Sequence, residues 1–263
     1  MSLKREIGFL FHIVRINLKS SLVLRGAFCA RLLFVAFNNL IFFVSWVIFF
    51  KKFILVNGWN FHHVCFMYGL VNVALGVNTL FFNGLKLLPK LVEYGELDVL
   101  MTRPLSLLVS VASYKSDYSG LGSIISGIFL LSLSPITNAY ELLLVLFFIF
   151  TSIAVFASIT LLYGSLSFVF QDIGRLSMDL YNVMVMLSTI PNCIYKGILK
   201  IIIFTLIPVG FVSYLPVSFI IHKNPETLLF LLCGTLGLTV FSIFVFYKGL
   251  RRYESGSSSM VVG

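Results

Sequence analysis

The ionisable residues that could do chemistry are concentrated in one short segment near the middle of the sequence. EYGELDVLMTRP, residues 93–104, holds Glu93, Glu96, Asp98 and Arg103 in a chain of which only 11% is charged. Three carboxylates beside one guanidinium form a compact surface of mixed sign. Such a surface favours specific docking to a protein partner over lipid binding, for which bases alone would be expected. The alternative is a solvated loop whose charges only keep it out of a membrane.

Other residue types associated with catalysis or metal binding occur without a functional pattern. The adjacent His62 and His63 would point about 100° apart on a helix, which suits a shared metal ion poorly. The sequence has no H-E-x-x-H motif and no phosphate-binding G-x-x-x-x-G-K-[ST] loop. The remaining histidines and all the cysteines are scattered: His12, His222, Cys29, Cys65, Cys193 and Cys233. We therefore expect no catalytic residue, no metal site and no cofactor in this chain.

The composition identifies the environment in which the charged segment is placed. Hydrophobic residues make up 59% of the 263 residues, and the mean hydropathy is +1.02, whereas a soluble domain is about 45–50% apolar. The apolar runs are continuous rather than alternating, which predicts helices rather than a barrel. The sequence thus predicts an all-α integral membrane protein, with one transmembrane domain over residues 1–263.

Charge-free runs indicate where the membrane spans lie. Spans are expected at about 28–50, 61–83, 117–134, 141–168, 176–192 and 226–247. Because both ends of the chain are basic, the positive-inside rule favours six crossings, with both termini in the cytoplasm. Most basic residues then lie inside, and the exceptions are Lys51, Lys52, Lys196, Lys200 and Lys223. This bias accounts for the net charge of +9 without nucleic-acid binding.

A seventh apolar run, at 198–221, is expected not to cross the membrane. Pro208, Gly210 and Pro216 interrupt it, and such residues break a straight helix. We expect a re-entrant segment on the outer side, before the sixth span. Its irregular backbone should be buried in protein or line a cavity, because lipid cannot satisfy its polar groups.

Two segments outside the spans have apolar residues at helical spacing. Residues 3–20 predict an amphipathic interfacial helix on the cytoplasmic leaflet, or else an ordinary cytoplasmic extension of the first span. Residues 84–101 predict a short amphipathic helix in the loop between the second and third spans. Arg103 is expected at a turn, because a residue before proline avoids the α region. The charged segment therefore lies at the cytoplasmic face.

Three motifs, far apart and in order, carry a family resemblance. The first, G-E-L-D-x-L-x-x-R-P, is matched by Gly95, Glu96, Leu97, Asp98, Leu100, Arg103 and Pro104. The second is IPVGFVSYLP at 207–216, with Pro208, Gly210, Tyr214 and Pro216. The third is the tail KGLRRYESGSS at 248–258, with Arg251, Arg252, Tyr253 and Glu254. Together they resemble type-2 ATP-binding-cassette (ABC) export permeases, in the branch of small bacterial six-span permeases, over essentially the whole chain.

The resemblance implies the permease subunit of an ATP-driven exporter in the bacterial cytoplasmic (inner) membrane. In such proteins the loop after the second span forms a coupling helix, here within residues 93–104, that docks on a separate cytoplasmic ATPase subunit. That subunit would bind ATP and Mg²⁺. A second permease, identical or related, would complete the pathway within the membrane lipids. The Phe-rich spans mildly favour a hydrophobic or amphipathic substrate, and Tyr163, Tyr181 and Asn182 are candidates to face it.

A secondary transporter or channel not driven by ATP is the alternative function. Such proteins usually keep ionisable residues inside their spans, and the expected spans contain almost none. Asp172, Arg175 and Asp179 cluster near the cytoplasmic start of the fifth span, as a solvated connection or a second docking contact. A neighbouring gene for a phosphate-loop ATPase would distinguish the two functions, because only the cassette transporter requires one.

Overall fold

The chain folds into helices packed side by side. The computed structural model describes residues 3–21, 25–53, 58–134, 138–170, 173–191, 195, 197–205 and 207–253. The elements are α1 (Leu3–Ser21), α2 (Arg25–Lys52), α3 (Phe61–Phe81), α4 (Asn83–Glu93), α5 (Leu97–Met101), α6 (Leu107–Ala112), α7 (Ser119–Ser132), α8 (Ala139–Ser165), η2 (Leu166–Phe168), α9 (Gly174–Ser188), α10 (Ile198–Thr205), η4 (Val209–Phe211), α11 (Tyr214–His222) and α12 (Pro225–Leu250). No β-strand occurs in these residues, which confirms the expected helical class.

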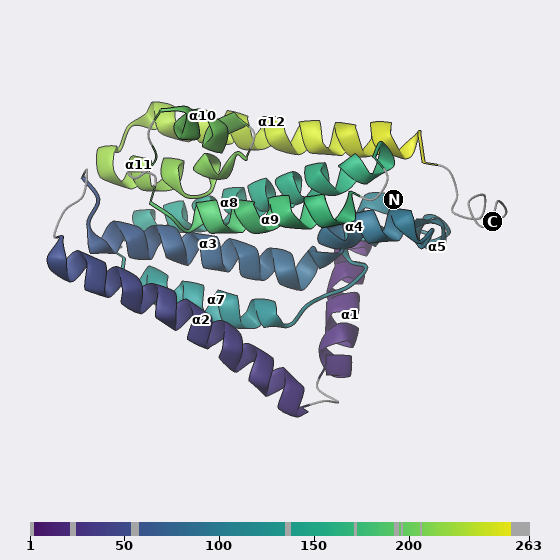
Figure 1. Ribbon diagram of the computed structural model, residues 1–263, viewed down its shortest axis with the longest axis horizontal. Helices are drawn as coiled ribbons and strands as arrows, with labels where there is room; N and C mark the ends of the chain where they lie inside the picture. Colours follow the sequence, from purple (N-terminus) through teal and green to yellow (C-terminus); the bar gives the residue numbers. More distant parts are fainter. Residues whose placement is uncertain are drawn as a thin grey trace.

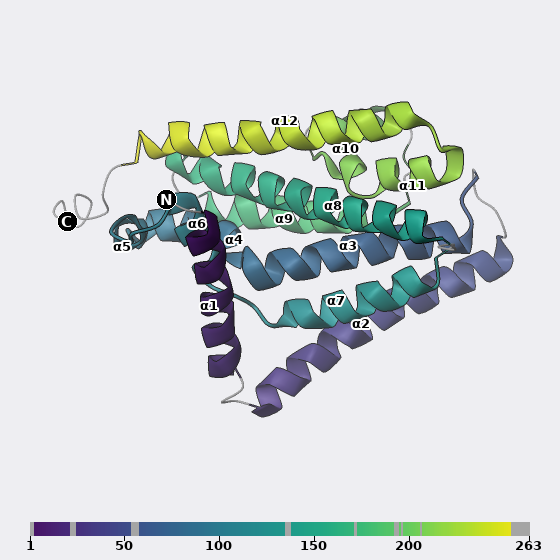
Figure 2. The same ribbon diagram turned by 180° about the vertical axis from the view of Figure 1, so that it is seen from behind.

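The helices at the expected spans follow the long axis of the molecule and alternate in direction. They are α2, α3, α7, α8, α9 and α12, with α2 inclined to the others (Figures 1 and 2). The short helices α4, α5 and α6 gather at one end, and α10, η4 and α11 gather at the other. In its most apolar 18-residue stretch α3 is 78% buried, so this helix forms the centre of the bundle.

Helix length separates the expected spans into two groups. Within the described residues, α2, α3, α12 and the continuous α8–η2 are each long and apolar enough to cross a membrane. α7 is apolar but has 14 residues, and α9 has 15, whereas a span needs about 20. A helical membrane protein is therefore confirmed, and the crossings by α7 and α9 stay predictions.

Four glycines allow the backbones of α3 and α7 to touch. Gly69 and Gly76 lie seven residues apart on α3, and Gly120 and Gly127 have the same spacing on α7. A Cβ atom at Gly120 would lie 2.3 Å from the Gly76 carbonyl oxygen, and one at Gly127 would lie 2.8 Å from that of Gly69. Because lipid is as apolar as the side chains, helices in membranes associate through such close packing of small residues.

α1 lies across the end of the bundle rather than along it (Figures 1 and 2). Val14 is buried, and Phe11 contacts Phe81 of α3 with ring centroids 5.6 Å apart. Arg15 and Lys19 are exposed. This arrangement suits a helix that lies in the plane of a membrane surface, with its basic side chains at the lipid head groups.

Replacing Gly120 by leucine should destabilise the bundle. Leucine raises helix propensity, but its side chain has no room against the Gly76 backbone, so we expect a loss of about 3 kcal/mol in the free energy of unfolding. Thermal unfolding of the purified protein in detergent measures the loss. Gly237→Leu on α12 is the control, since a Cβ atom there meets nothing within 4 Å. Equal melting temperatures for the two variants would contradict the proposed packing.

Candidate functional site

The charged segment belongs to a folded loop that continues directly from α3. A single residue, Phe82, separates α3 from α4, and its backbone (φ −123°, ψ 18°) bends the chain at that point. The expectation of one helix over 84–101 is corrected: α4 ends at Glu93, and α5 begins at Leu97. Gly95 between them has φ +70°, a left-handed conformation that glycine adopts without a steric penalty and that ends the first helix.

The apolar side of this loop is packed into a core at the end of the bundle. Leu88 of α4 and Leu97 and Leu100 of α5 are fully buried. They belong to a cluster that includes Phe168 of η2 and Phe246 of α12. The loop is therefore seated on the ends of α8 and α12.

The opposite side of the loop, here called the tip, is exposed and of mixed character. Glu93 and Glu96 are exposed. Tyr94, which lies between them in the sequence, is 67% exposed, and Val99, which follows them, is 65% exposed. The other matched motif residues surround this tip. Gly95, Asp98 and Arg103 are half-buried, and Pro104 is exposed. Apolar side chains beside carboxylates on a rigid base form a surface suited to protein docking.

One hydrogen bond holds Glu96 in the tip, and Glu93 lies close to the start of α9. Tyr114 Oη donates a hydrogen bond of 2.6 Å to Glu96 Oε2. The pKa of Tyr114 is raised, mainly by this hydrogen bond and to a smaller extent by burial. A Cβ atom at Gly174 would lie 3.7 Å from Glu93 Oε2. The carboxylate of Glu93 is thus beside the first turn of α9, where the helix dipole favours negative charge.

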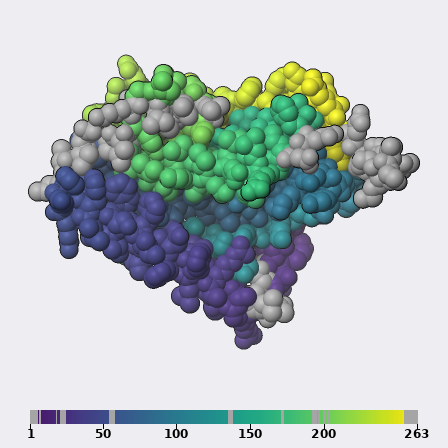
Figure 3. All heavy atoms as spheres, viewed as in Figure 1, coloured from purple at the N-terminus to yellow at the C-terminus, as the bar shows by residue number. Residues whose placement is uncertain are grey.

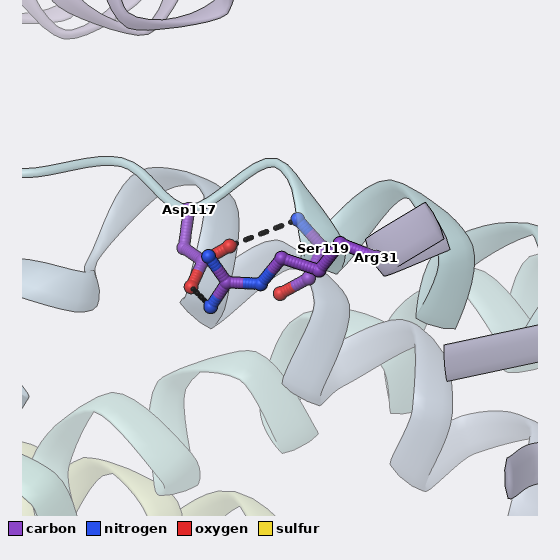
Figure 4. Close-up of polar contacts among 3 residues, drawn as sticks. All are labelled: Arg31, Asp117 and Ser119. Atoms are coloured by element: carbon purple, nitrogen blue, oxygen red, sulfur yellow. Dashed lines mark hydrogen bonds and ion pairs between the residues drawn. The ribbon is translucent and has the colours of Figure 1, made fainter. Parts of the chain in front are cut away.

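A polar cluster lies where the loop meets the spans. Arg31 of α2 forms an ion pair with Asp117 across 2.6 Å, and Asp117 Oδ1 accepts a hydrogen bond of 3.0 Å from the Ser119 backbone at the start of α7 (Figure 4). The Asp117 backbone N–H donates to the Thr79 carbonyl near the end of α3. This cluster, which the sequence analysis did not find, joins three span helices. No sequence signal indicates a pairing of residues 86 positions apart.

Lys86 of α4 extends this cluster towards α9. Its Nζ atom lies 4.3 Å from the centroid of the Tyr181 ring, a cation–π contact. Burial lowers the pKa of Lys86, Asp117 partly offsets this effect, and Arg31 adds to it. The loop region is therefore connected to α2 and α7 through Asp117, to α9 through the cation–π contact of Lys86, and to α3 through the continuous backbone.

The tail contacts the same core as the loop. The Tyr253 ring packs edge to face on Phe168, with centroids 6.2 Å apart. Arg251 and Arg252 are exposed beside it, and Glu254 lies outside the described residues. The first and third motifs therefore meet through Phe168, although about 150 residues separate them in the sequence.

The second motif lies at the opposite end of the molecule (Figure 1). Pro208, Gly210 and Pro216 are buried, and Tyr214 is half-buried with its ring 5.7 Å from that of Phe204. A Cβ atom at Gly210 would lie 2.6 Å from the Phe204 ring, so a larger residue there would require this ring to move. The irregular backbone between α10 and α11 is covered by protein rather than exposed to the surroundings.

The remaining candidate residues are not brought together. Tyr163 and Tyr181 pack into the main core, whereas Asn182 is exposed. Arg175 and Asp179 are exposed on α9, and Asp172 lies outside the described residues. No group of three His, Cys, Asp or Glu residues that could hold a metal ion occurs in the described part of the chain.

The apolar helices define a multi-pass helical membrane protein. A family model described as ABC-2 family transporter protein matches residues 36–257, and the chain belongs to this family. No curated protein and no solved structure gives a significant match. ABC-2 proteins are membrane components of ABC transporters, and in general they work with an ATP-binding subunit and are not themselves the ATPase.

Removing the Asp117 carboxylate should loosen the joint between loop and spans. Asp117→Ala loses the ion pair and the cap on α7, so we expect a loss of about 1–2 kcal/mol in the free energy of unfolding. Asp117→Asn keeps the hydrogen bond to the Ser119 backbone that caps the start of α7, and its loss in the free energy of unfolding should be about half as large. Thermal unfolding measures both, with Lys115→Ala as an exposed neighbouring control. If alanine and asparagine behaved alike, the cap would contribute nothing.

Proposed function

We propose that this chain is the permease subunit of an ATP-driven exporter and that the tip is its docking surface for a separate cytoplasmic ATPase subunit. The observation that carries the proposal is the exposed acidic and apolar tip on a fully buried base, directly continuous with the central helix α3. Its docking residues are Glu93, Gly95, Glu96, Asp98, Arg103 and Pro104. Leu97, which the motif also includes, is fully buried and holds the tip from beneath rather than contacting a partner. The family supports the pairing with an ATP-binding subunit in general terms.

The proposed topology is one transmembrane domain with six crossings and both termini in the cytoplasm. It is supported by the alternation of six helices along the long axis, and by the position of the start of α1 and the end of α12 near the same end (Figure 1). α7, with 14 residues, would be about 21 Å long and α9, with 15, about 22 Å, at 1.5 Å per residue. Each would cross the membrane together with the residues that precede and follow it in the chain. The segment from α10 to α11 is proposed as re-entrant.

The mechanism follows from these connections. The partner would bind ATP and Mg²⁺, and its closure would push the tip along the membrane normal or tilt it. Because α4 follows α3 after one residue and contacts α9 through Lys86, displacement of the loop would bias the packing of these helices. Two permease halves would enclose the pathway in the bacterial inner membrane, for a hydrophobic or amphipathic substrate.

The test is co-purification with the candidate ATPase subunit, co-expressed with the full chain. We expect Glu96→Arg and Tyr94→Ala each to weaken association at least about tenfold, since both side chains are exposed at the tip. Glu226→Arg and Tyr140→Ala are matched controls at the opposite end of the molecule. Tyr140 is 65% exposed, almost the same as Tyr94 at 67%.

The outcomes separate the candidate functions. Association of the unchanged chain that the tip variants lose and the controls keep would support the docking surface. Equal loss in all four variants would reject the tip as the contact. If no phosphate-loop ATPase from the same genome associated with the unchanged chain, a secondary transporter or channel would become the better explanation.

A further inference from the structure

Of the four long apolar helices in the described part of the chain, α2 is the one that the other helices cover least. None of its most apolar 18-residue stretch is buried, compared with 44% for α8 and 78% for α3. It packs on α7 and α3 with one side only, and its other side forms an edge of the molecule (Figures 1 and 3). If this side were purely apolar, lipid alone could cover it. Whether lipid or another protein surface covers it therefore depends on the polar residues that it carries.

The uncovered side of α2 carries a seam with the spacing of a helix–helix contact. Phe34, Asn38, Ile41, Ser45 and Ile48 follow one another at intervals of four and three residues, and all five are exposed. This spacing places them in one stripe along the helix. We call these five residues the seam.

The two polar residues of the seam lie deep within the expected membrane. Asn38 is seven residues from Arg31 and thirteen from Lys51, or roughly 10 and 20 Å along the helix. Ser45 Oγ is satisfied by the Ile41 carbonyl. The Asn38 amide has no hydrogen bond to any described residue. An amide exposed to hydrocarbon is costly, because lipid offers neither donor nor acceptor.

A second copy of α2 would satisfy this amide. Asparagine has both a donor and an acceptor, so two Asn38 side chains facing each other across a two-fold axis are complementary. Parallel helices place Asn38 opposite Asn38 and Ser45 opposite Ser45. Arg31, seven residues before Asn38, is neutralised by Asp117, so this side chain adds no repulsion between two copies.

We propose that the seam of α2 is the surface on which a second copy of this chain docks, with the Asn38 amides hydrogen-bonded to each other at the centre. The proposal rests on the proposed function, which requires two permease halves, and it names the contact between them. A single polar residue in such a seam specifies partner and register. Asn38 therefore determines how the halves align.

The test is disulfide crosslinking in membranes, using the full chain with its four native cysteines replaced by alanine. Ile41→Cys lies on the seam, and Leu40→Cys is its matched control, because both side chains are 52% exposed but they face different directions. Under mild oxidation we expect at least about fivefold more covalent dimer from Ile41→Cys. Adding Asn38→Leu to Ile41→Cys should reduce the dimer severalfold, and Asn38→Gln should restore part of it.

The crosslinking yields distinguish the possible outcomes. Equal crosslinking at the two positions, or no covalent dimer at position 41, would overturn the seam as the contact between copies. An unchanged yield with Asn38→Leu would overturn the role of the amide pair. Co-purification of the ATPase subunit is measured on the same membranes. Association without seam crosslinking would reject this inference alone, and loss of association from the unchanged chain would reject the proposed function.

Discussion

The backbone contact between α3 and α7 is the interaction on which the rest of this structure depends. Gly76 faces Gly120 and Gly69 faces Gly127, at distances that exclude any side chain. In a membrane this close packing replaces the hydrophobic effect as the force between helices. It fixes α3 at the centre of the bundle, with α8 on another side. α2 packs on this pair at the edge of the bundle, whereas α12 and α9 are placed by their contacts with α8.

The position of the charged loop follows from that centre. α4 begins one residue after α3, so the loop cannot be displaced without a force on the central helix. Asp117 is held by the Thr79 backbone and by Arg31 at the same level, and Lys86 connects this region to α9. The loop, α2, α3, α7 and α9 are therefore connected in one region at this end of the bundle.

The sequence by itself determined the class of this protein and the location of its candidate site. Continuous apolar runs in lipid can only be helices, because each backbone polar group must be paired within its own segment. Charges in so apolar a chain must gather outside the membrane, which singles out residues 93–104. Pro208 and Gly210 likewise predict irregular backbone, and residues 207–213 between α10 and α11 are irregular apart from the short η4. The sequence also predicts an interruption at Pro216, but this residue lies in the first turn of α11, where proline is tolerated.

Only the tertiary structure decided which of these local features meet. The glycine contacts, the Arg31–Asp117 pair and the packing of Tyr253 on Phe168 join residues far apart in the sequence. Periodicity and composition are properties of one segment, whereas these pairings depend on how helices from different parts of the chain are arranged.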